Sequence, residues 1–105
     1  MSNITDAHRA VVARVQDGEG RASHDLRKRA FDGAGLAEPL RTLIEKVALS
    51  ATTITDDDVA AVRASGASDD EIFELVVCGA VGQATRQYGR ALAALEAAAP
   101  AARQE

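Results

Sequence analysis

The sequence predicts an all-α protein, and three observations carry this prediction. Hydrophobic residues make up 47% of the 105-residue chain but aromatic residues only 3%, so the core must be built mainly from Ala, Val, Leu and Ile. Alanine has the highest helix propensity of all residues. Apolar positions recur at spacings of three and four, and no segment alternates apolar and polar residues as a half-buried strand does. We therefore expect a single helical domain.

The first helix is predicted over residues 4–16. Val11, Val12 and Val15 are spaced so that they share one helical face. The sequence DGEG at 17–20 should end this helix, because glycine is unfavourable in a helix interior and is common just after a helix end.

A second, shorter helix is predicted to begin after Ser23, whose hydroxyl can accept a hydrogen bond from a backbone N–H of the first turn. Leu26 and Ala30 give this helix a narrow apolar edge. Gly33 and Gly35 should end it, since glycine readily adopts the left-handed conformation that follows many helices.

The third helix is predicted over residues 38–51. Pro39 fits its first turn, where the missing backbone N–H would have no partner in any case. Its apolar positions are Leu40, Leu43, Ile44, Val47, Ala48 and Ala51. Their spacing of three and four is typical of an amphipathic helix.

Two similar sequences, TDDD and SDDE, are predicted to start the last two helices. In each, a hydroxyl residue is followed three positions later by an acidic residue, which is the pattern of a capping box. Thr55 pairs with Asp58 in the first, and Ser68 pairs with Glu71 in the second. Gly66 should end the first of these helices, because a residue without Cβ suits the left-handed position there.

The final helix is predicted from Asp69 to about Ala98 and is the longest. Its apolar stripe consists of Phe73, Val77, Ala80, Ala84, Tyr88, Ala91 and Leu95. We expect its first half to be buried on two sides and its second half on one. Gly79 and Gly82 should let another helix approach closely. Residues 99–105 are expected to form a disordered tail.

Charge and composition argue against several partners. Twelve basic and sixteen acidic residues give a net charge of −4, which disfavours a nucleic-acid partner. The basic cluster at 27–29 is interpreted as the solvated face of a helix. No segment stays apolar over the roughly 18 residues that a membrane span needs, and no apolar leader is evident at the N-terminus. We therefore expect a cytoplasmic protein with no membrane partner.

Residues 38–51 and 56–95 resemble the alkylhydroperoxidase D-like (AhpD-like) and carboxymuconolactone decarboxylase family of small helical proteins. The elements that carry the resemblance are a helix ending at a glycine, a Ser-Asp-Asp-Glu-Ile start and a long alanine-rich C-terminal helix. The resemblance implies an AhpD-like helical bundle at 37–98, preceded by a helical extension at 1–36. Members of the family form trimers or hexamers. A core of small side chains on a short chain also leaves apolar faces exposed, so we expect a homo-oligomer.

The redox branch of that family carries a Cys-x-x-Cys pair at the start of the helix before this glycine, with a histidine one turn further on. Aligned without gaps from Gly66 backwards, the cysteines fall on Ala51 and Ile54 and the histidine falls on Asp58. Peroxide reduction by such a pair needs a reactive thiolate and a second thiol to resolve it, and these positions supply neither. The resemblance therefore implies a member without this chemistry, which binds a small molecule or a partner protein.

An enzyme of the same family is the alternative. It would be either an alkylhydroperoxidase-like oxidoreductase using Cys78 with a thiol from elsewhere, or a decarboxylase or lyase acting on a small carboxylated substrate. In the second case, Asp58 or an arginine would have to transfer the proton. Cys78 is more simply interpreted as an inert core thiol, because its neighbours in the helix are apolar. Asp58 is more simply interpreted as a helix cap.

Gln83 and Arg86 are the best candidates for an inward-facing polar site that binds a ligand. They lie three residues apart in the middle of the last helix, and an arginine there could face an anionic group. We expect no metal and no cofactor, since His8 and His24 are not at a spacing typical of metal ligands and each is interpreted as part of a solvated or half-buried helix face.

Overall fold

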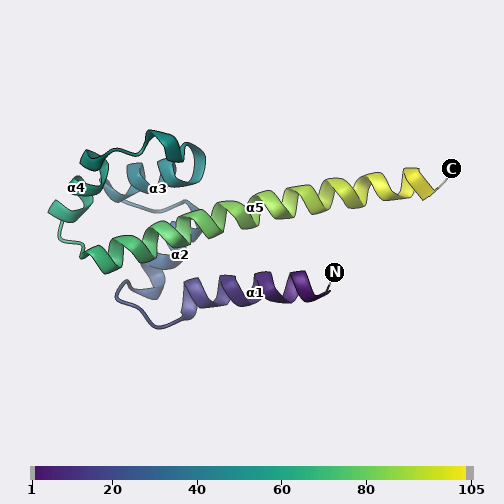
Figure 1. The fold of residues 1–105 in the computed structure, drawn as a ribbon, viewed down its shortest axis with the longest axis horizontal. Coiled ribbons are helices and arrows are strands. Elements are labelled where there is room, and N and C mark those ends of the chain that lie inside the picture. The colour runs from purple at the N-terminus through teal and green to yellow at the C-terminus, as the bar shows by residue number, and fades with distance from the viewer. Residues whose placement is uncertain (1, 104–105) are drawn as a thin grey trace.

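The computed structural model describes residues 2–103, with side chains described for residues 5–99, and this part of the chain is all-helical (Figure 1). The elements are, in order, α1 (Ser2–Asp17), α2 (His24–Asp32), α3 (Leu40–Leu49), the 3-10 turn η1 (Ala51–Thr53), α4 (Asp56–Ala64) and α5 (Asp69–Arg103). The predicted all-α class with a long C-terminal helix is confirmed. None of the described helices combines the length and the apolar character that crossing a lipid bilayer demands.

α5 is the axis of the molecule, and the other helices pack around its first half (Figure 1). α1 runs back along α5 in the opposite direction, so that Val15 lies at Cys78 and His8 lies at Thr85. α1 lies on one side of α5 in the view, and α3 and α4 lie on the other. The second half of α5 extends beyond this cluster, which gives the molecule extents of 59 × 29 × 21 Å.

The core forms two adjoining clusters, and α3 contributes to both. The larger cluster contains Ala22, Ala30, Phe31, Ile44, Leu75 and Cys78. The smaller cluster contains Leu43, Val62 and Ile72. Leu43, Ile44 and Leu75 are each only 1% exposed. Because α2 supplies Ala30 and Phe31 and the loop before it supplies Ala22, the N-terminal part that the structure describes packs into the same core as α3 and α5.

α2 crosses close over α5 at Gly82. A Cβ built on Gly82 would overlap the carbonyl oxygen of Phe31 and lie 2.7 Å from its carbonyl carbon. One turn earlier, a Cβ on Gly79 would lie 3.0 Å from Cγ2 of Ile44 in α3. Both glycines therefore act as predicted, because their missing side chains let α2 and α3 approach α5.

The loop between α1 and α2 is tied to α5 by the carboxylate of Glu74. Its oxygens accept hydrogen bonds from the backbone N–H of Arg21 at 2.7 and 2.9 Å and from that of Ala22 at 3.1 Å. A Cβ on Gly20 would overlap Oε1 of Glu74, so the loop passes the carboxylate at a distance only glycine allows. One acidic side chain thus satisfies two loop donors that would otherwise need water.

The predicted caps of α2, α4 and α5 are confirmed. The hydroxyl of Ser23 accepts a hydrogen bond from the N–H of Leu26 and caps α2, and Gly33 ends that helix in the left-handed region at φ 67°. Both capping boxes form, at the starts of α4 and α5. Gly66 follows α4 with φ 110°.

The prediction that the apolar stripe forms the buried face of α5 is wrong. Phe73 is 69% exposed and Leu95 is 64% exposed, and the alanines at 80, 84 and 91 are also exposed. The buried side chains of α5 are instead Ile72, Leu75 and Cys78. These three residues lie on the same face of α5 as Gly79 and Gly82. That face is buried because the two glycines let α2 and α3 pack closely against it.

The interpretation of 27–29 as a solvated face holds for Lys28 and Arg29 but is wrong for Arg27, which is only 3% exposed. Nη1 of Arg27 donates to the carbonyl oxygen of Gly18 at 2.6 Å, while its Nε has no partner among the described atoms. Arg27 is buried because its position on α2 faces α1 and the loop rather than solvent. Its long apolar stem can be buried there while the guanidinium bonds to the backbone.

Two helix boundaries differ from the prediction. α3 spans Leu40–Leu49 and is shorter at both ends than 38–51, since residues after Ser50 form η1 instead. α5 continues to Arg103, past the predicted end near Ala98 and into the segment expected to be a disordered tail. Alanine-rich sequence favours helix there, and it outweighs the proline. Residues 104 and 105 lie outside the described part of the chain.

Candidate functional site

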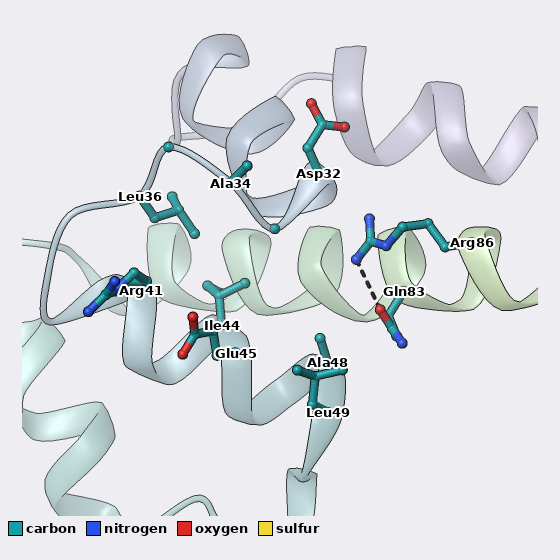
Figure 2. A pocket seen from close by; sticks show the side chains of 12 residues that line it. Asp32, Ala34, Leu36, Arg41, Ile44, Glu45, Ala48, Leu49, Gln83 and Arg86 are labelled. Atoms are coloured by element: carbon teal, nitrogen blue, oxygen red, sulfur yellow. Dashed lines mark hydrogen bonds between the residues drawn. The ribbon is translucent and has the colours of Figure 1, made fainter.

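A cavity of about 240 Å³ lies between the end of α2, one face of α3 and the middle of α5 (Figure 2). The turn at residues 32–36 forms one wall, and α3 forms another with Ile44, Ala48 and the rim residue Leu49. α5 contributes Gln83 and Arg86, the two residues that the sequence predicted for an inward polar site. The cavity therefore brings together three segments that are far apart in the sequence.

The turn that forms the first wall follows from the way α2 ends. Gly33 adopts the left-handed conformation, its N–H donates to the carbonyl oxygen of Ala30, and the N–H of Ala34 donates to that of Arg29. Gly35 also has a positive φ, of 75°. The chain consequently turns sharply away from α2 and leaves the space beside Arg86 open instead of filling it with another helical turn.

Two hydrogen bonds fix Arg86 at the inner side of the cavity. Nη1 donates to the carbonyl oxygen of Phe31 at 2.6 Å, and Nη2 donates to Oε1 of Gln83 at 3.1 Å (Figure 2). Phe31 lies in the last turn of α2, where carbonyl oxygens have no hydrogen-bond donor within the helix. Arg86 supplies that donor. A Cβ on Gly33 would lie 3.5 Å from Nη2, which shows how closely the turn passes the guanidinium.

Some charged side chains around the cavity have ion-pair partners and Arg86 has none among the described residues. At its edge, Arg41 forms an ion pair with Glu38 at 3.1 Å. Asp32 is paired with Lys28 at 3.5 Å. Arg86 is half-buried and has no carboxylate within 4.0 Å in the part of the chain that the structure describes. The cavity thus presents a cation without a counterion, held in place by neutral oxygens.

Cys78 does not reach this cavity. Its side chain is 1% exposed in the larger core cluster, and Sγ donates to the carbonyl oxygen of Val15 at 3.2 Å. Burial raises the pKa of the thiol above its ordinary value. A buried, protonated thiol that bonds to the backbone has the properties of a core residue and not those of a nucleophile.

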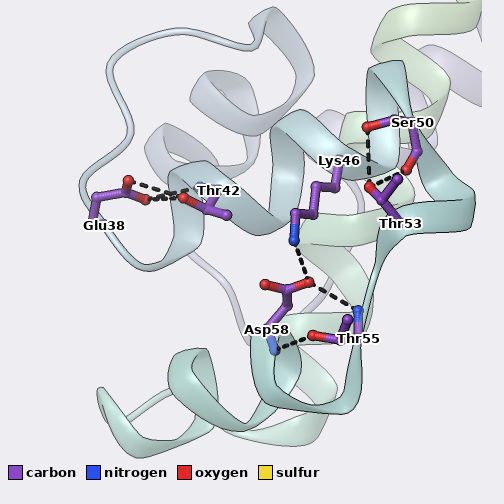
Figure 3. A network of polar contacts seen from close by, with 7 residues as sticks. All are labelled: Glu38, Thr42, Lys46, Ser50, Thr53, Thr55 and Asp58. Carbon is purple, nitrogen blue, oxygen red and sulfur yellow. Dashed lines mark hydrogen bonds and ion pairs between the residues drawn. The ribbon is translucent and has the colours of Figure 1, made fainter.

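Asp58 is held by contacts on two sides (Figure 3). Oδ2 accepts from Nζ of Lys46 at 2.8 Å and from the N–H of Thr55 at 2.9 Å, while the N–H of Asp58 donates to the hydroxyl of Thr55. The hydrogen bond from Lys46, followed by that from the Thr55 backbone, holds the pKa of Asp58 below its ordinary value. This carboxylate joins α3 to the start of α4 and is poorly suited to accept a proton.

We expect the contribution of Asp58 to stability to depend on pH. A carboxyl with a lowered folded-state pKa stabilises the protein above its unfolded-state pKa, and this stabilisation is lost as the pH falls through the folded-state value. Wild type should therefore be more stable than Asp58→Asn at neutral pH, and the difference should shrink below about pH 4. Urea unfolding of both proteins between pH 7 and pH 2 checks this. A difference that is the same at every pH would contradict it.

The two histidines occupy separate places on the helical surface. His8 stacks on Tyr88 with ring centroids 5.3 Å apart, and its Nε2 lies 3.1 Å from the hydroxyl of Thr85. His24 is exposed at the start of α2. Among the described residues, no group of three or more His, Cys, Asp or Glu side chains is arranged to hold a metal ion.

Sequence reasoning found the α5 residues of the cavity but missed the wall formed by residues 32–36 and the α3 residues Arg41 and Glu45. The Gly-x-Gly sequence at 33–35 was recognised only as a helix end. That signal predicts a turn, and the side chains facing the turn depend on how α2, α3 and α5 pack together.

The chain has no match among protein-family models, curated proteins or solved structures. The resemblance to the alkylhydroperoxidase D-like and carboxymuconolactone decarboxylase family therefore stays a prediction. The case for a function depends on the cavity and on the chemistry of the residues around it.

Proposed function

We propose that this chain is a small-molecule-binding module of the AhpD-like type without the redox cysteine pair, and that its ligand is a small carboxylate held in the cavity beside Gln83 and Arg86. The observation that carries the proposal is the half-buried guanidinium of Arg86, which lines the cavity without a counterion. A buried cation is costly unless an anion or several hydrogen bonds compensate it. A bound carboxylate would provide that compensation.

The size and walls of the cavity support a small, partly apolar ligand. Its volume of about 240 Å³ lies just below the roughly 300 to 1,000 Å³ of typical small-molecule sites. Leu36, Ile44 and Ala48 would contact the hydrocarbon part of such a ligand. The amide of Gln83 would add a second hydrogen bond to the carboxylate, because its nitrogen is the end not bonded to Arg86.

The surroundings of the other candidate residues favour binding over peroxide chemistry. Cys78 is buried away from the cavity, and Asp58 is committed to Lys46 and Thr55. Residues 51–54, where the redox branch carries its cysteines, form η1 and the residue after it. We infer that this segment serves only to connect α3 to α4.

A lyase or decarboxylase acting on a small carboxylated substrate is the second candidate. One observation favours it: Asp32 and Glu45 line the same cavity as Arg86, so an acid or base would be available near the substrate. Incubation of the protein with the carboxylates that bind it, followed by NMR of the small molecule, separates the two candidates. Loss of the carboxylate signal with formation of product supports the lyase, and an unchanged ligand supports the binding module.

The test of the binding proposal uses benzoate and its neutral analogue benzamide. We expect benzoate, added to ¹⁵N-labelled protein, to shift the amide signals of residues 33–36, 83 and 86, and benzamide to shift them much less. Arg86→Gln should weaken benzoate binding at least about tenfold, which corresponds to the loss of one charge-assisted hydrogen bond. Because Arg86 also bonds to α2, Gln83→Leu serves as a second variant that leaves that contact in place.

Arg90→Gln is the matched control. Arg90 is exposed, lies one turn beyond Arg86 and does not line the cavity. The substitution removes the same charge from the same helix as Arg86→Gln. Because the residue lies outside the cavity, benzoate binding should stay nearly unchanged. Equal shifts with benzoate and benzamide, or equal weakening by Arg86→Gln and Arg90→Gln, would reject a specific carboxylate site.

The module is further proposed to assemble as a homo-oligomer, a trimer or hexamer if it follows the resemblance. Support comes from the large apolar side chains that remain on the surface of one chain, Val11, Leu49, Phe73 and Leu95. Val11 and Leu49 are isolated on α1 and α3, which is common, but Phe73 and Leu95 both lie on α5 with exposed alanines between them. Contiguous exposed apolar surface is typical of an interface.

A further inference from the structure

α5 carries an apolar face that the other described helices leave largely open, apart from α1, whose His8 stacks on Tyr88 at one edge. It consists of Phe73, Val77, Ala80, Ala84, Tyr88, Ala91 and Leu95, which we call the outer seam. Phe73 and Leu95, at its two ends, are 69% and 64% exposed, and only Val77 and Tyr88 are half-buried. All of its positions are neutral. The seam is therefore an uncharged strip on an otherwise strongly charged protein.

The outer seam has the same spacing when followed in either direction from Ala84. Ala80 and Tyr88 lie four residues from Ala84, Val77 and Ala91 lie seven away, and Phe73 and Leu95 lie eleven away. A two-fold axis through Ala84, perpendicular to the helix, would therefore bring every seam residue opposite a seam residue of a second chain. Self-complementarity of this kind is what an isologous interface requires.

We propose that a second copy of this chain covers the outer seam, with the two α5 helices antiparallel and crossing at Ala84. In this arrangement Phe73 packs against Leu95 of the second copy at both ends. The alanines in the middle allow the helix axes to approach to about 8 Å, the short end of the range for packed helices. This rests on the homo-oligomer part of the proposed function and deepens it by naming an interface. Of the two assemblies named there, a two-fold interface is compatible with the hexamer and not with the trimer.

The charges beside the seam favour the antiparallel direction. The first half of α5 carries Asp69, Asp70, Glu71 and Glu74. Antiparallel helices that cross at Ala84 place the acidic start of each chain beside residues 94–99 of the other, of which only Glu96 is charged. Parallel helices would place the two acidic starts together. The opposed helix dipoles favour the same direction.

The surface also offers a hollow for the side chain at each end of the seam. A cavity of about 230 Å³ lies beside Phe73 and Val77, with Val15 of α1 in its apolar wall. In the antiparallel pair, Leu95 of the second copy lies opposite Phe73 and would enter this hollow. The large exposed side chain on the extended half of α5 therefore meets a depression on the packed half.

The extended half of α5 needs such a partner. From Arg90 to Ala98, every described side chain except Leu92 is exposed, so this part of the helix gains little from packing within the chain. Isolated helices of fewer than about 12 to 15 residues are only marginally stable in water. Packing against a second α5 would supply the missing contacts.

The test compares the molar masses of wild type, Ala84→Glu and Ala93→Glu by light scattering at micromolar concentration. We expect wild type and Ala93→Glu to have the mass of two chains or an even multiple of it. Ala84→Glu should have the mass of one chain, because the axis would bring two carboxylates together in an apolar strip. Ala93 is exposed on the opposite side of α5 and provides the same substitution as a control. Circular dichroism of Ala93→Glu should match that of wild type, and Ala84→Glu should stay folded and lose helical signal only from the extended half of α5.

Cysteine cross-linking tests the direction of the pair. Under copper-catalysed air oxidation, a mixture of Val77→Cys and Ala91→Cys should form a disulfide-linked heterodimer, while either variant alone should not, since the antiparallel pair places position 77 opposite 91. Native Cys78 is 1% exposed and should not react. A single-chain mass for wild type, an odd multiple such as a trimer, an unchanged mass for Ala84→Glu, or cross-linking of each variant with itself would overturn the proposal.

The carboxylate site and the antiparallel interface can be tested independently of each other. Gln83 and Arg86 face the cavity between α2 and α3, away from the outer seam. Benzoate titration of Ala84→Glu should therefore give the same amide shifts at residues 33–36 as wild type. If Ala84→Glu loses the dimer and still binds benzoate, the interface is supported independently of the ligand site. If wild type is a dimer that does not bind benzoate, only the ligand site is rejected.

Discussion

Gly82→Ala is expected to destabilise the protein by about 3 kcal/mol, the upper end of what overpacking of a core usually costs. The added Cβ would overlap the carbonyl oxygen of Phe31 and come within 2.7 Å of its carbonyl carbon and 2.9 Å of its Cα. All three atoms belong to the backbone of α2, so no side chain can rotate to make room. α2 would have to move away from α5, and the larger core cluster would lose contacts along its whole length.

Two other glycines on α5 provide matched controls for the same substitution. At Gly79 the nearest atom is Cγ2 of Ile44 at 3.0 Å, a side-chain atom that can shift, so Gly79→Ala should cost clearly less than Gly82→Ala. At Gly89 no atom lies within 4 Å. Gly89→Ala should therefore stabilise α5 by up to about 1 kcal/mol through helix propensity alone.

Urea unfolding followed by circular dichroism measures all three variants. The expected order of stability is Gly89→Ala above wild type, then Gly79→Ala, then Gly82→Ala. Equal losses for Gly79→Ala and Gly82→Ala would mean that α2 does not approach α5 as closely as described. The order matters more than the absolute values, because differences among related variants are less affected by the unfolded state.

The capped helix ends could be predicted from sequence because their causes are local. Thr55 with Asp58 and Ser68 with Glu71 form their capping boxes from residues three apart, whatever the rest of the chain does. Gly33 likewise ends α2 through bonds to its own last turn. Such features depend on the residues within one turn, all of which are visible in the sequence.

The orientation of α5 could not be predicted in the same way, because the helix has two apolar faces. Ile72, Leu75 and Cys78 form one of them, and Phe73 and Leu95 belong to the other, and both satisfy helical spacing. Spacing alone cannot decide which face is inside. The deciding feature is the pair of glycines on the first face, Gly79 and Gly82, whose missing side chains let α3 and α2 approach that face.

The candidate site was predictable only in its α5 part, for a related reason. Gln83 and Arg86 share a helix, so their proximity follows from sequence spacing. Their third partner, the carbonyl oxygen of Phe31, lies 55 residues away from Arg86 and is brought there by the crossing of α2 at Gly82. Arg27 was misread because a run of basic residues usually faces solvent, and its burial depends on α1 and the loop that follows it.

Glu74→Ala is expected to destabilise the protein by about 2 to 3 kcal/mol, the range for hydrogen bonds to a charged group together with the donors left unsatisfied. The carboxylate accepts from the N–H groups of Arg21 and Ala22, and these bonds connect the loop after α1 to α5 across more than fifty residues of sequence. Without them, Ala22 would keep its buried position in the core with no partner for its N–H. The amides of Arg21 and Ala22 should therefore exchange with solvent much faster.

Hydrogen exchange measured by NMR distinguishes this loop effect from a general loss of stability. Glu74→Gln keeps one oxygen as an acceptor, so it should lie between wild type and Glu74→Ala in both stability and amide protection. Glu96→Ala removes the same side chain from the exposed half of α5 and should change the free energy of unfolding by no more than about 0.5 kcal/mol. If Glu74→Ala proves as mild as Glu96→Ala, the loop must be held instead by its other bonds to the helices, from Arg27 to the carbonyl oxygen of Gly18 at 2.6 Å and from Arg14 to that of Glu19 at 3.4 Å.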